Sequence, residues 1–304
     1  MRRIAHIVNP FYAENSSEQY FAQKITFETM RLARKFSRDH VKVDLFSVFF
    51  PEDQQFSPED FQSVTELDRS VSDVATFKHK RKLPLLVDII DRLYESSDAE
   101  YFIYTNVDIA LMPHFYIAVD RFLELGYDSF VINRRTIPDH FKDINEIPLM
   151  YSELGIPHEG HDCFVFRRAL HKKFNYGNTC IGMPFINRVL IFNFECHAKN
   201  FNEFKRKHLT FHIGNYTDWL NDDYFDYMAH NKMEFGKILL ELEANYGAFD
   251  KTGPLSAYLI DDIISGDRIN SDNKIENKHN RSIFYRLILR PLEFIVNTFF
   301  RDKK

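Results

Sequence analysis

Apolar runs of strand length alternate with helical patterns over the first half of the chain, and this alternation limits the fold more than any other feature. Apolar runs at residues 4–8 and 41–50 enclose a helical pattern over residues 17–36. A strand, a helix and a second strand in this order typically form a parallel unit with a right-handed crossover. Alternating helices and strands continue over residues 83–133. The sequence therefore predicts an α/β domain with an open sheet and helices on both faces.

Composition narrows the class of protein. The 304 residues suffice for one large domain whose core needs neither metal nor disulfide to hold it together. The net charge of −5 argues against a nucleic-acid binder, whose phosphate contacts need a basic excess. Three cysteines without C-x-x-C spacing argue against a disulfide scaffold and a thiolate zinc site. With no signal-peptide pattern at the start and no spanning apolar run, we expect a cytoplasmic protein.

Two polar residues follow the most apolar strand pattern of the chain. The run that begins at Tyr101 changes character at Thr105 and continues as Asn106-Val107-Asp108. Ligands of open α/β sheets bind beyond the carboxyl ends of the strands, and residues two apart in a strand share a side. A carboxylate and an amide there suit a divalent cation and a sugar hydroxyl. The alternative is that Asp108 caps the next helix, although Pro113 is the natural first residue of that helix.

This Tyr-Thr-Asn-Val-Asp-Ile pattern resembles the D-x-D region of GT-A fold glycosyltransferases, which transfer a sugar from a nucleotide diphosphate sugar. The resemblance covers roughly residues 1–220 and implies a Rossmann-like open mixed sheet. It implies that Asp108 coordinates Mn²⁺ or Mg²⁺ on the diphosphate. Asn106 stands where the family has its first acid, so it would hydrogen-bond the ribose or the sugar without adding charge.

Two later residues fall in the order that this family shows. Asp162, in His158-Glu-Gly-His-Asp, matches an acid that contacts the acceptor and acts as the base in inverting members. His212 matches a C-terminal histidine that completes the cation site or contacts the diphosphate. The alternatives are an aspartate that ends a turn and a histidine of the core. The spacing of His158 and His161 is not H-E-x-x-H, which argues against a zinc hydrolase.

Three further residues are candidates for contacts to the donor. Asn9 closes the first strand, where the nucleotide base rests in this fold. Arg134 and Arg135 follow the strand at residues 128–133, and arginine grips phosphate bidentately. No P-loop and no G-x-G-x-x-G motif occurs, which argues against those two kinds of nucleotide site.

The end of the chain differs in character from the rest. We expect a catalytic domain over residues 1–269, a polar linker over 270–280 and an amphipathic helix over 281–304, with six basic and two acidic side chains in that helix. Such a helix suits the anionic inner face of a membrane, where the protein would be peripheral. The alternative is that this helix packs on the main domain or on a second subunit. In the latter case the protein would form a homo-oligomer.

Together these features predict a metal-assisted glycosyltransferase of polysaccharide biosynthesis that acts on a glycan or lipid-linked acceptor. One rival is a nucleotidyltransferase, but such an enzyme normally presents a glycine- and basic-rich loop after the first strand, which residues 9–18 lack. The other rival is an inactive, membrane-associated sugar-binding or scaffold protein of the same fold. Asn106, in place of an acid, keeps that rival open.

Overall fold

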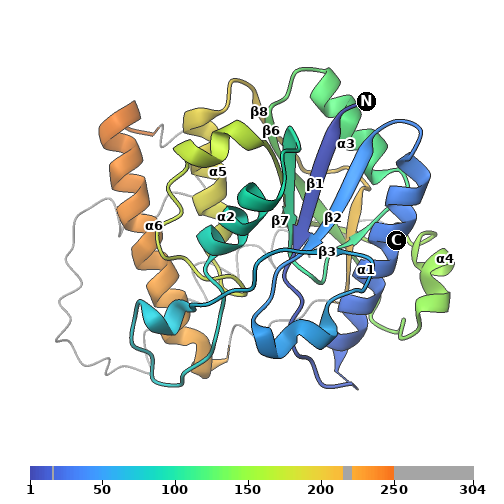
Figure 1. Cartoon of the computed structure of the whole chain (residues 1–304), viewed down its shortest axis with the longest axis horizontal. Coiled ribbons are helices and arrows are strands. Elements are labelled where there is room, and N and C mark those ends of the chain that lie inside the picture. The colour runs from blue at the N-terminus through green and yellow to red at the C-terminus, as the bar shows by residue number, and fades with distance from the viewer. Residues whose placement is uncertain (16, 215–220, 250–304) are drawn as a thin grey trace, which may run out of the picture. The chain divides into compact units, whose positions relative to one another are not determined.

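A mixed β-sheet forms the centre of the molecule in a computed structural model, which describes residues 1–15, 17–214 and 221–249. Within these residues the strand order is β3-β2-β1-β4-β7-β6-β9-β5, and β8 pairs with β6 (Figure 1). Antiparallel pairing joins β7 to β4 and β6, and β5 to β9, whereas the other neighbours are parallel. The strands are β1 (Arg3–Val8), β2 (Lys42–Ser47), β3 (Gln62–Ser63), β4 (Tyr101–Thr105), β5 (Ala110–Leu111), β6 (Ser129–Ile137), β7 (Ile156–Arg167), β8 (Phe201–Phe204) and β9 (Thr210–Ile213).

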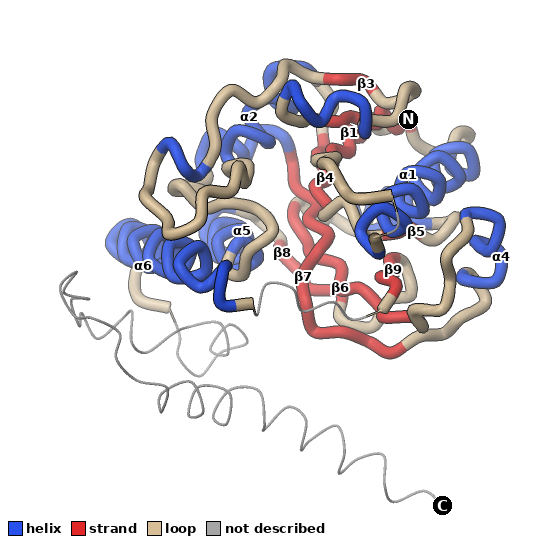
Figure 2. Tube along the Cα trace, turned by 90° about the horizontal axis from the view of Figure 1, so that it is seen from below, coloured by secondary structure: helices blue, strands red, loops and turns tan. Residues whose placement is uncertain are grey.

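Helices cover both faces of this sheet (Figure 2). The central strands carry apolar side chains on both faces, so both faces have to be covered. Side chains such as Ile103 and Val165 pack against α1 and α3, while Phe102 and Phe164 pack against α2 and α5. Helix α6 packs on α5 through Phe235 and its neighbours. The helices are α1 (Glu18–Ser37), α2 (Leu86–Ser96), α3 (Phe115–Glu124), α4 (Ile147–Met150), α5 (Ile186–His197) and α6 (Phe225–Tyr246).

The predicted open mixed α/β sheet with helices on both faces is confirmed for the described residues. The strand that begins at Tyr101 ends at Thr105, where its pattern changes, and residues 106–109 form a turn closed by a bond from the Ile109 amide to the Asn106 carbonyl. Asn106 and Asp108 therefore lie in a turn, and the strand alternation applied to them does not hold. The linker and tail predicted at 270–304 lie outside the described residues.

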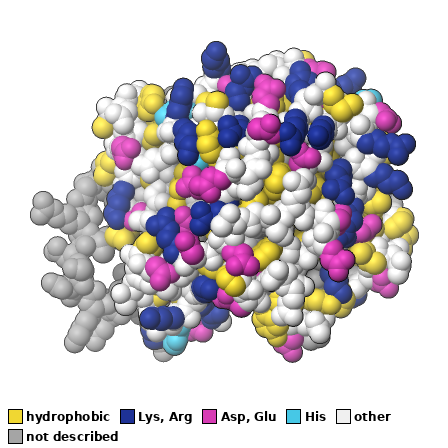
Figure 3. All heavy atoms as spheres, in the orientation of Figure 1, with side chains coloured by type: hydrophobic (Ala, Val, Ile, Leu, Met, Phe, Trp, Pro, Cys, Tyr) yellow, Lys and Arg dark blue, Asp and Glu magenta, His cyan; other side chains and the backbone are white. Residues whose placement is uncertain are grey.

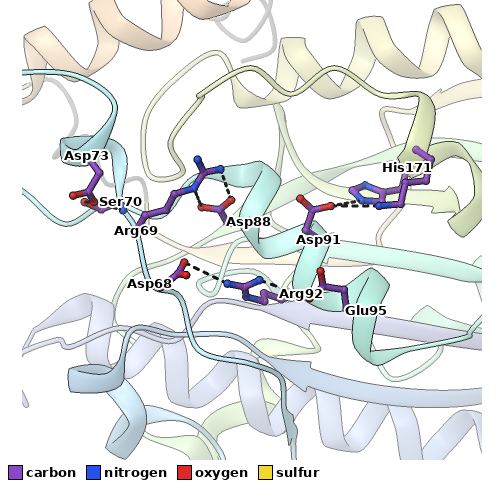
Figure 4. Close-up of polar contacts among 10 residues, drawn as sticks. Asp68, Arg69, Ser70, Asp73, Asp88, Asp91, Arg92, Glu95 and His171 are labelled. Atoms are coloured by element: carbon purple, nitrogen blue, oxygen red, sulfur yellow. Dashed lines mark hydrogen bonds and ion pairs between the residues drawn. The ribbon is translucent and has the colours of Figure 1, made fainter.

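Ion pairs attach the irregular segment between β3 and α2 to the outer side of α2 (Figure 4). Arg69 donates to both carboxylate oxygens of Asp88 at 2.9 and 2.7 Å, and Arg92 donates to Asp68 at 3.3 Å. Asp88 is buried, so its pairing with a guanidinium offsets the cost of removing a charge from water. The helix therefore holds this segment at two points.

The surface carries charges of both signs. Lys and Arg side chains are interspersed with Asp and Glu over the face seen in Figure 3. Ion pairs such as Arg2 with Asp120 occur among the described residues. Within the part of the chain that the structure describes, no helix combines the length and apolarity needed to cross a bilayer.

Candidate active site

The carboxyl ends of three central strands meet at one edge of the sheet. β1 is parallel to β4, and both β4 and β6 run antiparallel to the strand between them, β7. The turn after β4, the second half of β6 and the first half of β7 therefore lie side by side. Strand β9 joins this edge, because it pairs with the end of β6. Most of the residues singled out in the sequence come together here.

Asp108 and His212 are in direct contact although 104 residues separate them in sequence. Asp108 lies in the turn after β4, and His212 lies in β9 with its side chain almost fully buried. His212 Nε2 is 3.1 Å from Asp108 Oδ2. The Asp108 side chain keeps about 36% of its surface exposed, although its Oδ1 atom is buried.

The contact between Asp108 and His212 requires a positive charge. The other ring nitrogen of His212, Nδ1, lies 2.9 Å from the carbonyl oxygen of Gly214, and a carbonyl only accepts, so Nδ1 carries a proton. In a neutral imidazole Nε2 would then present a lone pair to the carboxylate. Either a second proton or a metal cation makes the contact favourable. Although desolvation opposes it, the charge and hydrogen bond of His212 lower the pKa of Asp108.

The donor set at Asp108 fits a cation that is shared with another ligand. Asp108 Oδ1 is buried and has no hydrogen-bond partner in the described residues. Adjacent ligands of an octahedral Mg²⁺ at 2.0–2.1 Å are about 3 Å apart, close to the observed separation of oxygen and nitrogen. No group of three or more His, Cys, Asp or Glu side chains suited to a metal occurs among residues 1–15, 17–214 and 221–249. The protein thus offers two ligands here, and phosphate and water would supply the others.

Asp162 is held by two partners, one in β6 and one in the turn after β4. Its Oδ2 accepts from Arg134 Nη1 at 2.9 Å, and its Oδ1 accepts from Asn106 Nδ2 at 3.3 Å. Asn106 Oδ1 accepts in turn from the hydroxyl of Tyr104 at 3.1 Å. An aspartate at position 106 would place a second carboxylate against Asp162 and could not donate to it. The amide of Asn106 can therefore donate to Asp162, which an ionised aspartate at this position could not do.

Arg134 and Arg135 both lie within β6 rather than after it, and they have different partners. The pairing of β6 with β7 shifts register between Asn133 and Arg135, so the contacts and not regular alternation assign the two side chains. Arg134 turns toward Asp162, whereas Arg135 donates to the backbone carbonyls of Leu154 and Gly155. The structure thus brings one of the two predicted arginines into the cluster.

His158 and Thr136 are site residues that sequence reasoning missed. His158 Nδ1 accepts from the Gly160 amide at 2.7 Å, so a neutral ring carries its proton on Nε2. Burial and the Arg134 charge lower the pKa of His158 to about 4. Gly160 makes room for this ring, since a Cβ at Gly160 would lie 2.6 Å from Nδ1. Thr136 is the register partner of His212, and its hydroxyl is buried without a partner in the described residues.

The motif His158-Glu-Gly-His-Asp contains His158, but its spacing gives that histidine no partner. The other histidine of the motif, His161, points away from the cluster, and its Nε2 contacts Glu203 of β8. Desolvation opposes ionisation of Glu203, but the hydrogen bond and charge of His161 outweigh it and lower the pKa of Glu203 to about 2. No pattern in the sequence singles out Thr136.

Asn9 lies at the same edge of the sheet but belongs to a different group. Its amide donates to the Val48 carbonyl at 2.7 Å, which ties the ends of β1 and β2 together. The chain beyond Asn9 lines an open cavity of about 580 Å³. The ring of Tyr12 meets that of Phe56 edge to face, at 5.4 Å between centroids. The cavity is lined by Tyr12, Glu14, Asn15, Gln55 and Phe56.

Comparisons with known proteins give a likeness in structure alone. No family model matches the chain, and no curated protein is similar to it. Among solved structures, residues 1–349 of S. aureus TarS in complex with UDP-GlcNAc are 10% identical to it, with 86% of this chain and 76% of that chain covered and a TM-score of 0.45. The same part of TarS in complex with UDP gives 10% identity, the same coverage and a TM-score of 0.41. The fold assignment above stands on the pairing of this chain's own strands.

Proposed function

We propose that this protein is a glycosyltransferase that moves a sugar from a nucleotide diphosphate sugar to a glycan or lipid-linked acceptor. The observation that carries the proposal is the Asp108–His212 contact, which needs a positive charge and leaves one buried carboxylate oxygen without a partner. A cation-dependent site at the carboxyl edge of an α/β sheet is suited to a diphosphate. Arg134, whose charge acts on Asp108 and which contacts Asp162, adds a second positive group.

Asp108 and His212 would hold Mn²⁺ or Mg²⁺. When bound, the cation supplies charge neutralisation for a diphosphate leaving group. The residues of the protein do the rest. Asp162 orients the acceptor hydroxyl and, in an inverting transfer, accepts its proton as the acceptor oxygen bonds to the anomeric carbon and the bond from that carbon to the diphosphate breaks.

The cavity beyond Asn9 is the candidate subsite for the nucleotide base. Aromatic rings at Tyr12 and Phe56 offer stacking surface, and the side chains of Asn15 and Gln55 offer donors and acceptors for base edges. Asn9 itself shapes this subsite by fixing the ends of two strands. The basic, amphipathic sequence of residues 281–304 supports a peripheral site of action at the inner face of a membrane, where lipid-linked acceptors are found.

Calorimetry with nucleoside diphosphates and a screen of nucleotide sugars for hydrolysis, each with and without Mn²⁺, test the proposal. We expect binding and slow hydrolysis that depend on the cation. Asp108→Asn keeps the size of the side chain but removes its charge, so it should abolish the cation dependence and leave thermal unfolding nearly unchanged. Asp98→Asn, at an exposed carboxylate on the opposite edge of the sheet, is the matched control. If the wild-type protein shows no cation-dependent binding of any nucleotide, the scaffold alternative holds instead.

A further inference from the structure

Arg134 and Asp162 form a nearly buried ion pair in which the two groups satisfy each other only in part. Their side chains are 13% and 11% exposed, and the contact is 2.9 Å long. A guanidinium has five donors, but the structure shows one N–H of Arg134, on Nη1, directed at Asp162. Arg134 Nε is buried without a partner in the described residues. The arginine therefore has donors to spare in a place where they are costly to leave unused.

The same pair is an obstacle to the role of Asp162 that we propose above. With Oδ2 bonded to Arg134 and Oδ1 bonded to Asn106, both oxygens of Asp162 already have partners before an acceptor hydroxyl arrives. The pair also occupies the arginine that a diphosphate would need. Both difficulties disappear if Arg134 changes partners.

We propose that Arg134 is exchanged between Asp162 and the diphosphate of the donor, so that donor binding releases Asp162 for the acceptor. This inference rests on the proposed function. A diphosphate carries more charge than one carboxylate and presents oxygens that accept bidentately from a guanidinium. It therefore competes for Arg134 on favourable terms. The donor then binds before the acceptor is activated.

Asn106 keeps Asp162 in position when the arginine leaves. Its amide donates to Asp162 Oδ1, the oxygen that Arg134 does not contact, while its own carbonyl oxygen is fixed by the Tyr104 hydroxyl. This neutral donor can hold the carboxylate in place after the guanidinium has left. Asp162 therefore stays directed into the site, with Oδ2 available to an acceptor hydroxyl after the exchange.

Binding of inorganic pyrophosphate in the presence of Mn²⁺, measured by calorimetry, tests the exchange without any chemistry. Asp162→Asn removes the competitor for Arg134, so we expect it to tighten pyrophosphate binding about tenfold. Arg134→Gln should weaken binding about tenfold or more. In the Arg134→Gln background, Asp162→Asn should no longer tighten binding, because there is nothing left to release.

Two controls separate exchange from a general effect of charge. Glu159→Gln removes one negative charge from an exposed position three residues away and should change binding less than twofold. Asp162→Ser, checked by circular dichroism, repeats the test should the asparagine variant fold poorly. Unchanged or weaker binding by both Asp162 variants overturns the inference, as does equal tightening with and without Arg134. A wild-type protein that binds neither pyrophosphate nor a nucleoside diphosphate overturns the proposed function instead.

Discussion

His6 should make the protein lose stability as the pH falls below 6.5, and the size of the loss follows from its burial. His6 lies in β1 without solvent exposure, and its ring nitrogens contact the hydroxyls of Tyr116 at 2.8 Å and Thr105 at 2.9 Å. Burial lowers the pKa of His6 from 6.5 to about 3. The folded protein therefore keeps this ring neutral at pH values where the unfolded chain binds a proton.

The sign and the magnitude follow from proton linkage. Because the unfolded state binds more protons between pH 6.5 and 3, the free energy of unfolding decreases as the pH is lowered through this range. From pH 7 to pH 5, His6 alone should remove about 2 kcal/mol. This figure holds for any folded pKa of His6 below roughly 4.5, because the folded ring then stays neutral at pH 5.

Urea unfolding followed by circular dichroism at pH 7, 6 and 5 measures the effect. His6→Gln keeps a donor and an acceptor for the two hydroxyls but does not titrate, so the free energy of unfolding of this variant should fall by about 2 kcal/mol less than that of the wild type between pH 7 and 5. The comparison removes the contributions of the other histidines, which both proteins share. Equal losses in the two proteins would show that the folded state protonates His6 as readily as the unfolded one.

Two further pairs of substitutions test backbone packing and buried charge. Gly155 has φ +60°, and a Cβ there would lie 2.7 Å from the Thr136 carbonyl oxygen, so Gly155→Ala should lower the free energy of unfolding by about 2 kcal/mol or more. Gly126→Ala, at φ +92° in open space, should cost clearly less, and equal losses would refute the steric reason. Asp88→Ala removes a buried carboxylate from its arginine and should cost about 1–3 kcal/mol in urea unfolding. Asp68→Ala removes an exposed partner and should change the free energy of unfolding by no more than about 0.5 kcal/mol. If Asp68→Ala lowered the free energy of unfolding more than Asp88→Ala does, the argument from burial would be refuted.

The strands could be predicted where the pattern of apolar residues is strong. The order of the strands in the sheet could not be predicted. β1, β2, β4 and the helices between them follow from alternating patterns in the sequence. The position of β9 between β6 and β5 does not, because strand order depends on pairings between distant residues that periodicity does not encode. β8 was missed because all four of its residues are half-buried and carry no clear alternation.

The candidate site was predictable in part for the same reason. Asp108 follows from its place after an apolar strand, whereas the choice of Asp162 and His212 depended on a resemblance and not on their own patterns. Arg134 and Arg135 could not be told apart while β6 was expected to end at residue 133. Their partners distinguish them only in the structure, because a register shift between Asn133 and Arg135 interrupts the alternation that a sequence pattern assumes.

The attachment of the segment before α2 has a mechanical consequence. The Arg69–Asp88 and Arg92–Asp68 pairs fix this segment to one side of α2, and the backbone of Leu85 and Leu86 is bonded to Thr179 and Cys180 on the approach to α5. The side chain of Asn231 in α6 accepts from the backbone amide of Cys180 and donates to the backbone carbonyl of Cys180. These bonds join the segment before α2, the approach to α5 and α6 into one connected unit, in which parts far apart in the sequence support each other.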